Sequence, residues 1–173
     1  MRVSALAGLT MVGLIMTTGA FAADPPAASS SPVIIISGAG SAASATAKDL
    51  AQLPITKVTV AFEGPHGSHP ASFEGPLLWG VLEHFGAIDN AKPRDQAHRA
   101  VLVTGRDGYT ATLALGEIAP AFEGKQVILA EREGGHPIDP AHLRIVVPGD
   151  KAGGRSVYDL VRIDVVTPGP AVH

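Results

Sequence analysis

Trp79 and Arg144 are the residues whose chemistry and setting best suit the recognition of a flat ligand. Trp79 is the only tryptophan and stands beside the apolar stripe of a predicted helix, so its ring either packs against the core or stacks on a planar ligand. Arg144 stands inside the apolar run at residues 143–147, where a cation needs a partner or a ligand. The remaining arginines near predicted loops and strand ends are interpreted as solvated surface charges: Arg94, Arg99, Arg106 and Arg155.

Two histidines, His66 and His69, lie in a turn rich in Gly and Pro and could bring two imidazoles to a metal ion. No third ligand stands nearby in the sequence, and His136 and His142 would have to approach in space. The alternative is that these histidines are simply exposed in turns. The sequence leaves both interpretations open.

A glycine-rich stretch at residues 36–43 is similar to a dinucleotide-binding turn, in which backbone N–H groups at a helix start hold a pyrophosphate. Glu63, at the end of the next predicted strand, could mimic the acid that binds a ribose. However, the segment after that strand turns back as a hairpin and does not start another βαβ unit. We therefore interpret residues 36–43 as a Gly/Ala/Ser loop that leads into a short helix.

The composition excludes several classes of site. The sequence contains no cysteine, which rules out disulfides, zinc–thiolate sites, iron–sulfur clusters and thiol nucleophiles. The formal net charge of −3 gives no electrostatic basis for binding nucleic acid or anionic lipid. At 173 residues with 46% hydrophobic residues, the chain is long enough to bury one ordinary core.

The N-terminus has the pattern of a secretory signal peptide over residues 1–22. A basic start precedes an apolar stretch, and Ala20-Phe21-Ala22 supplies the small residues that signal peptidase reads, so we expect cleavage after Ala22. A membrane anchor is the alternative, but the stretch is short for a span. Since no twin-arginine pair occurs, we expect export by the general secretory route to the periplasm or beyond. Residues 23–32 are interpreted as a flexible linker.

The rest of the sequence predicts one domain over residues 33–167, followed by a tail at 168–173. Apolar alternation predicts strands, and a stripe of apolar residues at helical spacing predicts a helix over residues 77–85. A turn with Asp-Gly at residues 105–108 predicts a hairpin. Predicted strands cover residues 33–36, 55–62, 71–73, 100–104, 109–115, 126–131, 143–147 and 157–166, and further short helices cover 47–53 and 115–122. The expected fold is α+β, mainly a β mixed sheet with a few short helices.

Five motifs in this order resemble the oxidoreductase molybdopterin-binding domain, which has the sulfite-oxidase-type fold. Each motif is weak alone, and the specificity comes from their order over residues 33–167. The resemblance is carried by Asp49-Leu50-Ala51-Gln52-Leu53-Pro54, Phe73-Glu74-Gly75-Pro76-Leu77-Leu78-Trp79, Gly105-Arg106-Asp107-Gly108-Tyr109, Val127-Ile128-Leu129-Ala130 and Leu143-Arg144-Ile145-Val146-Val147-Pro148-Gly149-Asp150. It implies a cleft for a pterin-based cofactor.

The resemblance also implies a cysteine ligand for molybdenum, which this sequence lacks. We therefore expect an exported protein that binds a pterin or molybdopterin-type ligand without redox molybdenum, and that senses the ligand for a membrane signalling enzyme through its periplasmic domain. The ligand candidates are Trp79, Asp107, Tyr109 and Arg144. Asp107 is equally suited to forming its turn.

Two alternatives stay open. One is a molybdopterin-dependent oxidoreductase, and the other is a partner-binding domain that has lost the ligand. No catalytic residue and no metal ligand are assigned.

Overall fold

The computed structural model describes residues 32–64, 67–89 and 92–169 of the chain. The predicted signal peptide at residues 1–22, the predicted linker up to residue 31, and His66 lie outside the described residues. The first strand begins at Pro32 and the last ends at Val166.

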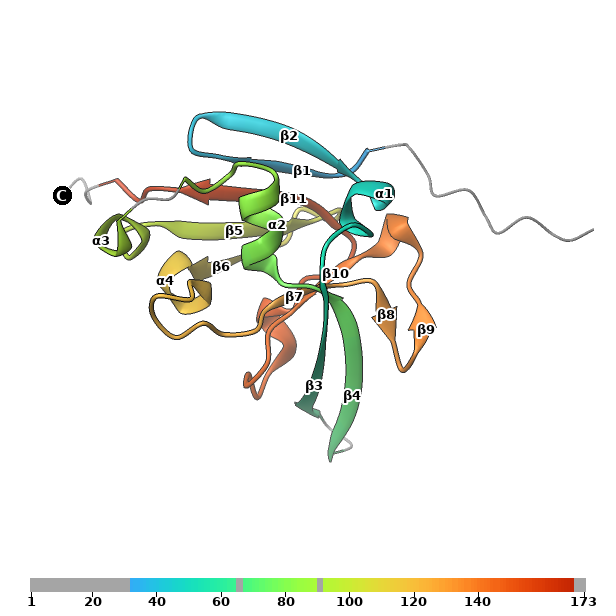
Figure 1. Ribbon diagram of the computed structural model, residues 1–173. Helices are drawn as coiled ribbons and strands as arrows, with labels where there is room; N and C mark the ends of the chain where they lie inside the picture. The colour runs from blue at the N-terminus through green and yellow to red at the C-terminus, as the bar shows by residue number, and fades with distance from the viewer. Residues whose placement is uncertain (1–31, 65–66, 90–91, 170–173) are drawn as a thin grey trace, which may run out of the picture.

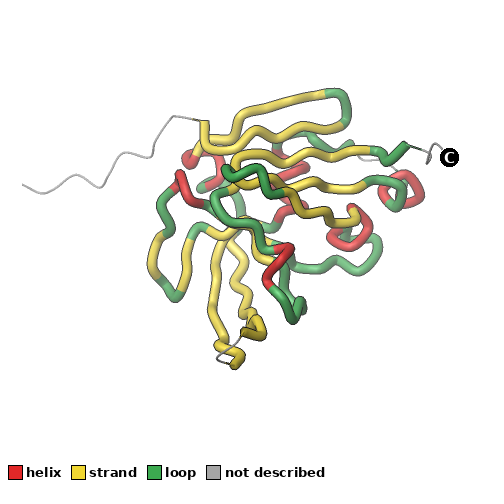
Figure 2. Tube along the Cα trace, turned by 180° about the vertical axis from the view of Figure 1, so that it is seen from behind, coloured by secondary structure: helices red, strands yellow, loops and turns green. Residues whose placement is uncertain are grey.

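The larger sheet has five strands in the order β2-β1-β11-β5-β6. Its central pair, β1 and β11, is parallel, whereas every other neighbouring pair is antiparallel. Figures 1 and 2 show this sheet from its two sides. The strands are β1 (Pro32–Gly38), β2 (Ser41–Thr46), β5 (Ala100–Gly105), β6 (Thr110–Ala114) and β11 (Leu160–Val166).

Strand β2 corrects the interpretation of the glycine-rich stretch. Ala39 and Gly40 both have positive φ, 44° and 79°, as the central residues of a tight hairpin turn require. The chain therefore turns back and pairs with β1 instead of forming a loop that leads into a helix or a phosphate-binding turn. The short helix α1 (Ala47–Leu50) begins only after β2, and Thr46 and Asp49 close its N-terminus as a capping box.

A second sheet projects away from the first (Figure 1), in the order β3-β4-β8-β9. Its long hairpin of β3 (Ile55–Gly64) and β4 (Gly67–Pro76) confirms the predicted alternation, since Val58 and Val60 are buried. Strands β8 (Arg132–Glu133) and β9 (His136–Pro137) are short.

A two-stranded ribbon, β7 (Ile128–Ala130) and β10 (Arg144–Val146), is buried on both faces. Leu129 and Ile145 face the larger hydrophobic cluster, and Ile128 and Val146 face a smaller cluster with Phe73. Because successive side chains of a strand alternate between faces, Arg144 lies on the same face as Val146, towards the smaller cluster.

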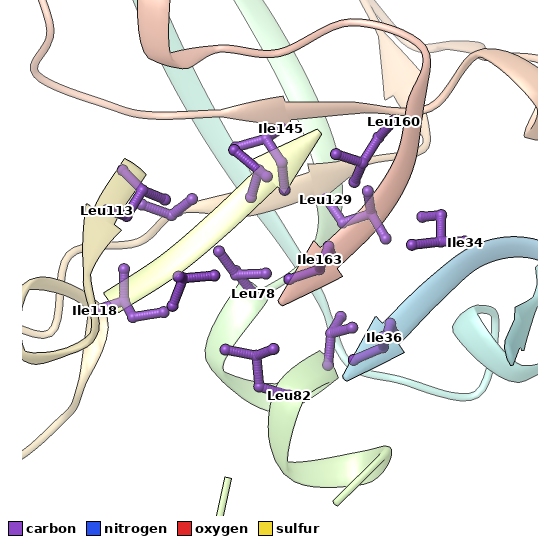
Figure 3. Close-up of a cluster of buried hydrophobic side chains, with 14 of the residues drawn as sticks. Ile34, Ile36, Leu78, Leu82, Leu113, Ile118, Leu129, Ile145, Leu160 and Ile163 are labelled. Carbon is purple, nitrogen blue, oxygen red and sulfur yellow. The ribbon is translucent and has the colours of Figure 1, made fainter. Parts of the chain in front are cut away.

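Helix α2 (Leu78–His84) lies on one face of the five-stranded sheet. Its stripe of Leu78, Val81 and Leu82 is fully buried, as the helical spacing predicts. In Figure 3, Leu78 and Leu82 point towards side chains from the sheet and from the β7–β10 ribbon. Two further helices are single turns, α3 (Pro93–Gln96) and α4 (Leu115–Ile118). Within the described ranges, no helix is long and apolar enough to cross a membrane.

The last strand is shorter than the predicted range of residues 157–166. Asp159 has a φ of 48°, so the backbone bends there and β11 begins at Leu160. The segment before the bend runs beside β10 instead, where the N–H of Ile145 donates to the carbonyl of Val157 at 2.9 Å. This bend places Tyr158 on the surface, where it is 62% exposed.

Candidate functional site

A small open pocket of about 170 Å³ lies where the β5–β6 turn meets the single 3₁₀ turn η2 (Gly153–Arg155). We call it the two-tyrosine pocket because Tyr109 and Tyr158 both line it. These two side chains are 52% and 62% exposed, so their rings are accessible to a ligand. The complete lining is Asp107, Tyr109, Gly153, Gly154, Ser156, Val157 and Tyr158.

Asp107 holds the β5–β6 turn with one carboxylate oxygen and leaves the other one available. The N–H of Tyr109 donates to its Oδ1 at 2.9 Å, and Gly108 supplies the positive φ of 85° that the turn requires. Within the described residues, Oδ2 makes no hydrogen bond. Asp107 therefore serves as a turn former and still offers an acceptor at the pocket.

Tyr109 joins the β5–β6 turn to the opposite wall of the pocket. Its hydroxyl donates to the carbonyl of Gly154 at 2.8 Å, which ties η2 to the end of the hairpin. The ring of Phe62, from the long β3–β4 hairpin, lies against Gly153. Aromatic side chains from two separate hairpins therefore contact the wall formed by Gly153 and Gly154, which we call the glycine wall.

Arg155 fixes the glycine wall by ionic contacts. Its guanidinium donates to both oxygens of Asp150, at 2.6 and 2.9 Å, and to both oxygens of Glu117, at 3.0 and 3.2 Å. These bonds to Arg155 lower the pKa of Asp150. Burial raises the pKa of Glu117, but hydrogen bonds from Lys125 and Arg155 outweigh that effect, so the pKa is lowered.

Arg144 does not line the two-tyrosine pocket but lies behind one of its walls. Its guanidinium carbon is 3.7 Å from the ring centroid of Tyr158 and 4.7 Å from that of Phe73. The residue is only 5% exposed, and Glu133 is its ion-pair partner at 3.9 Å. Arg144 therefore has the partner that a cation in this strand requires, and that partner consists mainly of two aromatic rings.

Trp79 lies elsewhere. It is partly buried on α2, where it packs against the larger hydrophobic cluster, and it does not contribute to the two-tyrosine pocket. The structure therefore brings Asp107 and Tyr109 together, places Arg144 in the layer behind them, and leaves Trp79 apart.

Sequence reasoning missed Tyr158, Arg155 and the glycines of η2. Tyr158 fell inside a predicted strand, and Arg155 was interpreted as a surface charge. Gly153-Gly154 signals a turn before Arg155, but this pair lies outside the predicted strand and gives no signal for Tyr158.

The histidines give no metal cluster in the described part of the chain. There, no three His, Asp or Glu side chains are gathered in a way that could hold a metal ion. His142 contacts Asp159 at 2.8 Å through its Nδ1. His66 lies outside the described residues, so the suggested site with His69 stays a hypothesis.

No protein-family model and no curated protein match the chain. Among solved structures, it is similar to the sulfane dehydrogenase SoxCD from Paracoccus pantotrophus, with a TM-score of 0.62 and 18% identity. The match covers 78% of this chain and 38% of that chain. The likeness is one of fold alone, and it supports the α+β fold of the sulfite-oxidase type predicted from the sequence.

Proposed function

We propose that this chain is an exported protein that binds a planar, metal-free pterin-type ring in the two-tyrosine pocket. The observation that carries the proposal is the meeting of two exposed tyrosine rings and Asp107 in one pocket, where Asp107 has a carboxylate oxygen that bonds to none of the described residues. An aromatic face stacks on a flat heterocycle, and a carboxylate accepts from its amino and ring N–H groups.

The size of the pocket limits the ligand. Pockets for drug-sized ligands occupy roughly 300–1,000 Å³, and this one is about 170 Å³. A single bicyclic ring suits that space, with its substituents directed towards solvent. Because one face of the ring of Tyr158 is covered by Arg144, the ligand would use the other face or the ring edge.

A molybdenum centre of the sulfite-oxidase kind does not fit these residues. Such a centre takes a cysteine thiolate as ligand, and the sequence contains none. The pocket itself offers one carboxylate and two phenols, and the carboxylate already serves the turn. The donor set therefore suits hydrogen bonding to a ring better than coordination of a metal.

The export and sensing parts of the proposal rest on the sequence. The signal-peptide pattern at residues 1–22 supports a periplasmic or secreted location, and the family resemblance supports relay to the periplasmic domain of a membrane signalling enzyme. Fractionation of cells that express the full chain tests the location, with a chain lacking residues 1–22 as control. A cytoplasmic full-length protein would contradict it.

The binding test uses isothermal calorimetry of the purified protein with dihydroneopterin. We expect saturable binding that Asp107→Asn weakens about tenfold or more, because Asn keeps an acceptor for the turn but lacks the charged second oxygen. Asp95→Asn, exposed on α3, is the matched control and should leave the affinity unchanged. Absence of binding up to about 1 mM, or equal affinity in Asp107→Asn, would contradict the proposal.

Elemental analysis separates the two alternatives. Stoichiometric molybdenum in protein purified from its exported compartment would favour a molybdopterin-dependent oxidoreductase. Neither molybdenum nor pterin binding, together with a captured protein partner, would favour a domain that has kept the fold for partner binding alone.

A further inference from the structure

Arg144 is a buried cation with an incomplete set of polar partners. It is 5% exposed, and Glu133 approaches no closer than 3.9 Å through a side chain that is itself 51% exposed. Its Nε is buried and makes no hydrogen bond to any residue that the structure describes. A buried charge without full pairing is costly, so this arrangement requires another source of stabilisation.

Two aromatic rings supply that stabilisation. The guanidinium lies over the ring of Tyr158 at 3.7 Å and over that of Phe73 at 4.7 Å, both within the range of a cation–π interaction. Phe73 is 2% exposed and belongs to the smaller hydrophobic cluster, so it is fixed by packing. Tyr158 is 62% exposed, and the guanidinium of Arg144 lies over one face of its ring, so we expect this contact to orient the ring.

We propose that Arg144 is a positioning residue that holds Tyr158 as a wall of the two-tyrosine pocket and makes the pocket select neutral planar rings over cationic rings of the same shape. The ligand selectivity rests on the proposed function, whereas the positioning of Tyr158 does not. Arg144 acts through the ring because it does not line the pocket itself.

The selectivity follows from the electrostatics of an aromatic ring. The face of a phenol ring is electron-rich and attracts cations. A guanidinium on one face already draws on that electron density, and its positive charge lies only 3.7 Å behind the ring. A second cation on the exposed face is therefore repelled, whereas a neutral ring stacks without this penalty.

The first test needs no ligand. We replace Arg144 by Met, which keeps an unbranched apolar stem without the guanidinium and its charge, and follow the tyrosine ring signals by NMR in the folded protein. Arg144→Met should shift the ring signals of Tyr158 and leave those of Tyr109 nearly in place. Unmoved Tyr158 signals would overturn the inference. Arg94→Met, exposed on α3, is the control.

The second test compares quinoline with N-methylquinolinium, two flat bicyclic rings that differ in charge, at a pH where quinoline is neutral. The wild-type protein should prefer quinoline, and Arg144→Met should reduce that preference about 3- to 10-fold. The quantity compared is the ratio of the two affinities in each protein, so the steric effect of the methyl group, which is the same in both proteins, cancels. Arg144→Lys keeps the charge and should retain most of the preference.

The outcomes distinguish the two proposals. If Tyr158 moves in Arg144→Met but wild-type protein does not bind dihydroneopterin, the pterin function fails and the positioning role of Arg144 stands. If pterin binds but the quinoline preference is the same in both proteins, the selectivity fails. Should Arg144→Met not fold, Arg144→Gln carries the NMR test, since Gln also removes the positive charge from behind the ring.

Discussion

Arg155 should contribute to stability because it closes a cluster of opposite charges behind the glycine wall of the pocket. It bridges Asp150 and Glu117, which come from segments far apart in the sequence, and Glu117 also binds Lys125. The Arg155→Gln substitution removes the positive charge and the planar fork of donors. Asp150 then loses its ion-pair partner, whereas Glu117 keeps Lys125.

The magnitude follows from burial. The Arg155 side chain is 35% exposed, and those of Asp150 and Glu117 are 15% and 16% exposed. A surface ion pair contributes about 0–1 kcal/mol, and loss of one partner of a buried pair costs about 3–5 kcal/mol. For this intermediate case we expect a loss of about 2 kcal/mol in the free energy of unfolding, which lowers Tm by about 4–8 °C.

The loss should depend on pH. The folded pKa values of Asp150 and Glu117 lie below their ordinary values of 3.8 and 4.5, so their stabilising effect is fully present above those values. As the pH falls through the folded pKa values, both carboxylates are protonated and the effect disappears. The difference between wild type and Arg155→Gln should therefore be largest near neutral pH and should shrink in acid.

Urea denaturation followed by the fluorescence of Trp79 measures this difference, because Trp79 is the only tryptophan and packs against the core. The matched control is Arg94→Gln, since Arg94 is exposed on α3. Equal stability of Arg155→Gln and wild type at pH 7, or a difference that persists unchanged at pH 3, would refute the reasoning.

Two further predictions concern the packing and the electrostatics. Gly75→Ala should destabilise the fold by more than about 3 kcal/mol in urea denaturation, because the new Cβ would lie 1.9 Å from the carbonyl oxygen of Leu129. A Cβ added at Gly80 meets no atom within 4 Å, so Gly80→Ala should stabilise α2 by about 0.5–1 kcal/mol. An equal effect of the two would contradict the packing argument. Burial raises the pKa of Glu131, so ionisation above its ordinary value of 4.5 opposes folding, and Glu131→Gln should be more stable than wild type at pH 8 with no gain at pH 4. Thermal unfolding across this range measures the gain, with exposed Glu83→Gln as control, and a gain that is constant with pH would argue against it.

The sequence predicted the parts of the fold in which local pattern and burial agree. The apolar stripe on α2 and the alternation at Val58 and Val60 are strong signals of secondary structure, because in each the apolar residues recur on one buried face. Strand β2 was missed because Ser41–Thr46 contains only Ser, Ala and Thr, which give no apolar contrast. These residues adopt the strand conformation because they pair with β1, and this tertiary effect overrides their local preference.

The site could be predicted only in part for a similar reason. Asp107 and Tyr109 are local to one turn, and a motif can reveal them. The stack of Arg144 on Phe73 and Tyr158 joins three separate segments, which no sequence spacing encodes. The bend at Asp159 that exposes Tyr158 depends on a positive φ at a residue other than glycine, which is uncommon.

The parallel pairing of β1 with β11 has a consequence for the order of folding. Ser37 and Asp164 are joined across this pair although they stand 127 positions apart. Since β11 lies between the β1–β2 hairpin and the β5–β6 hairpin in the five-stranded sheet, the two hairpins stay separate until β11 has paired with both of them. Contacts of such long sequence separation slow folding, so the domain should complete its core late, when β11 pairs.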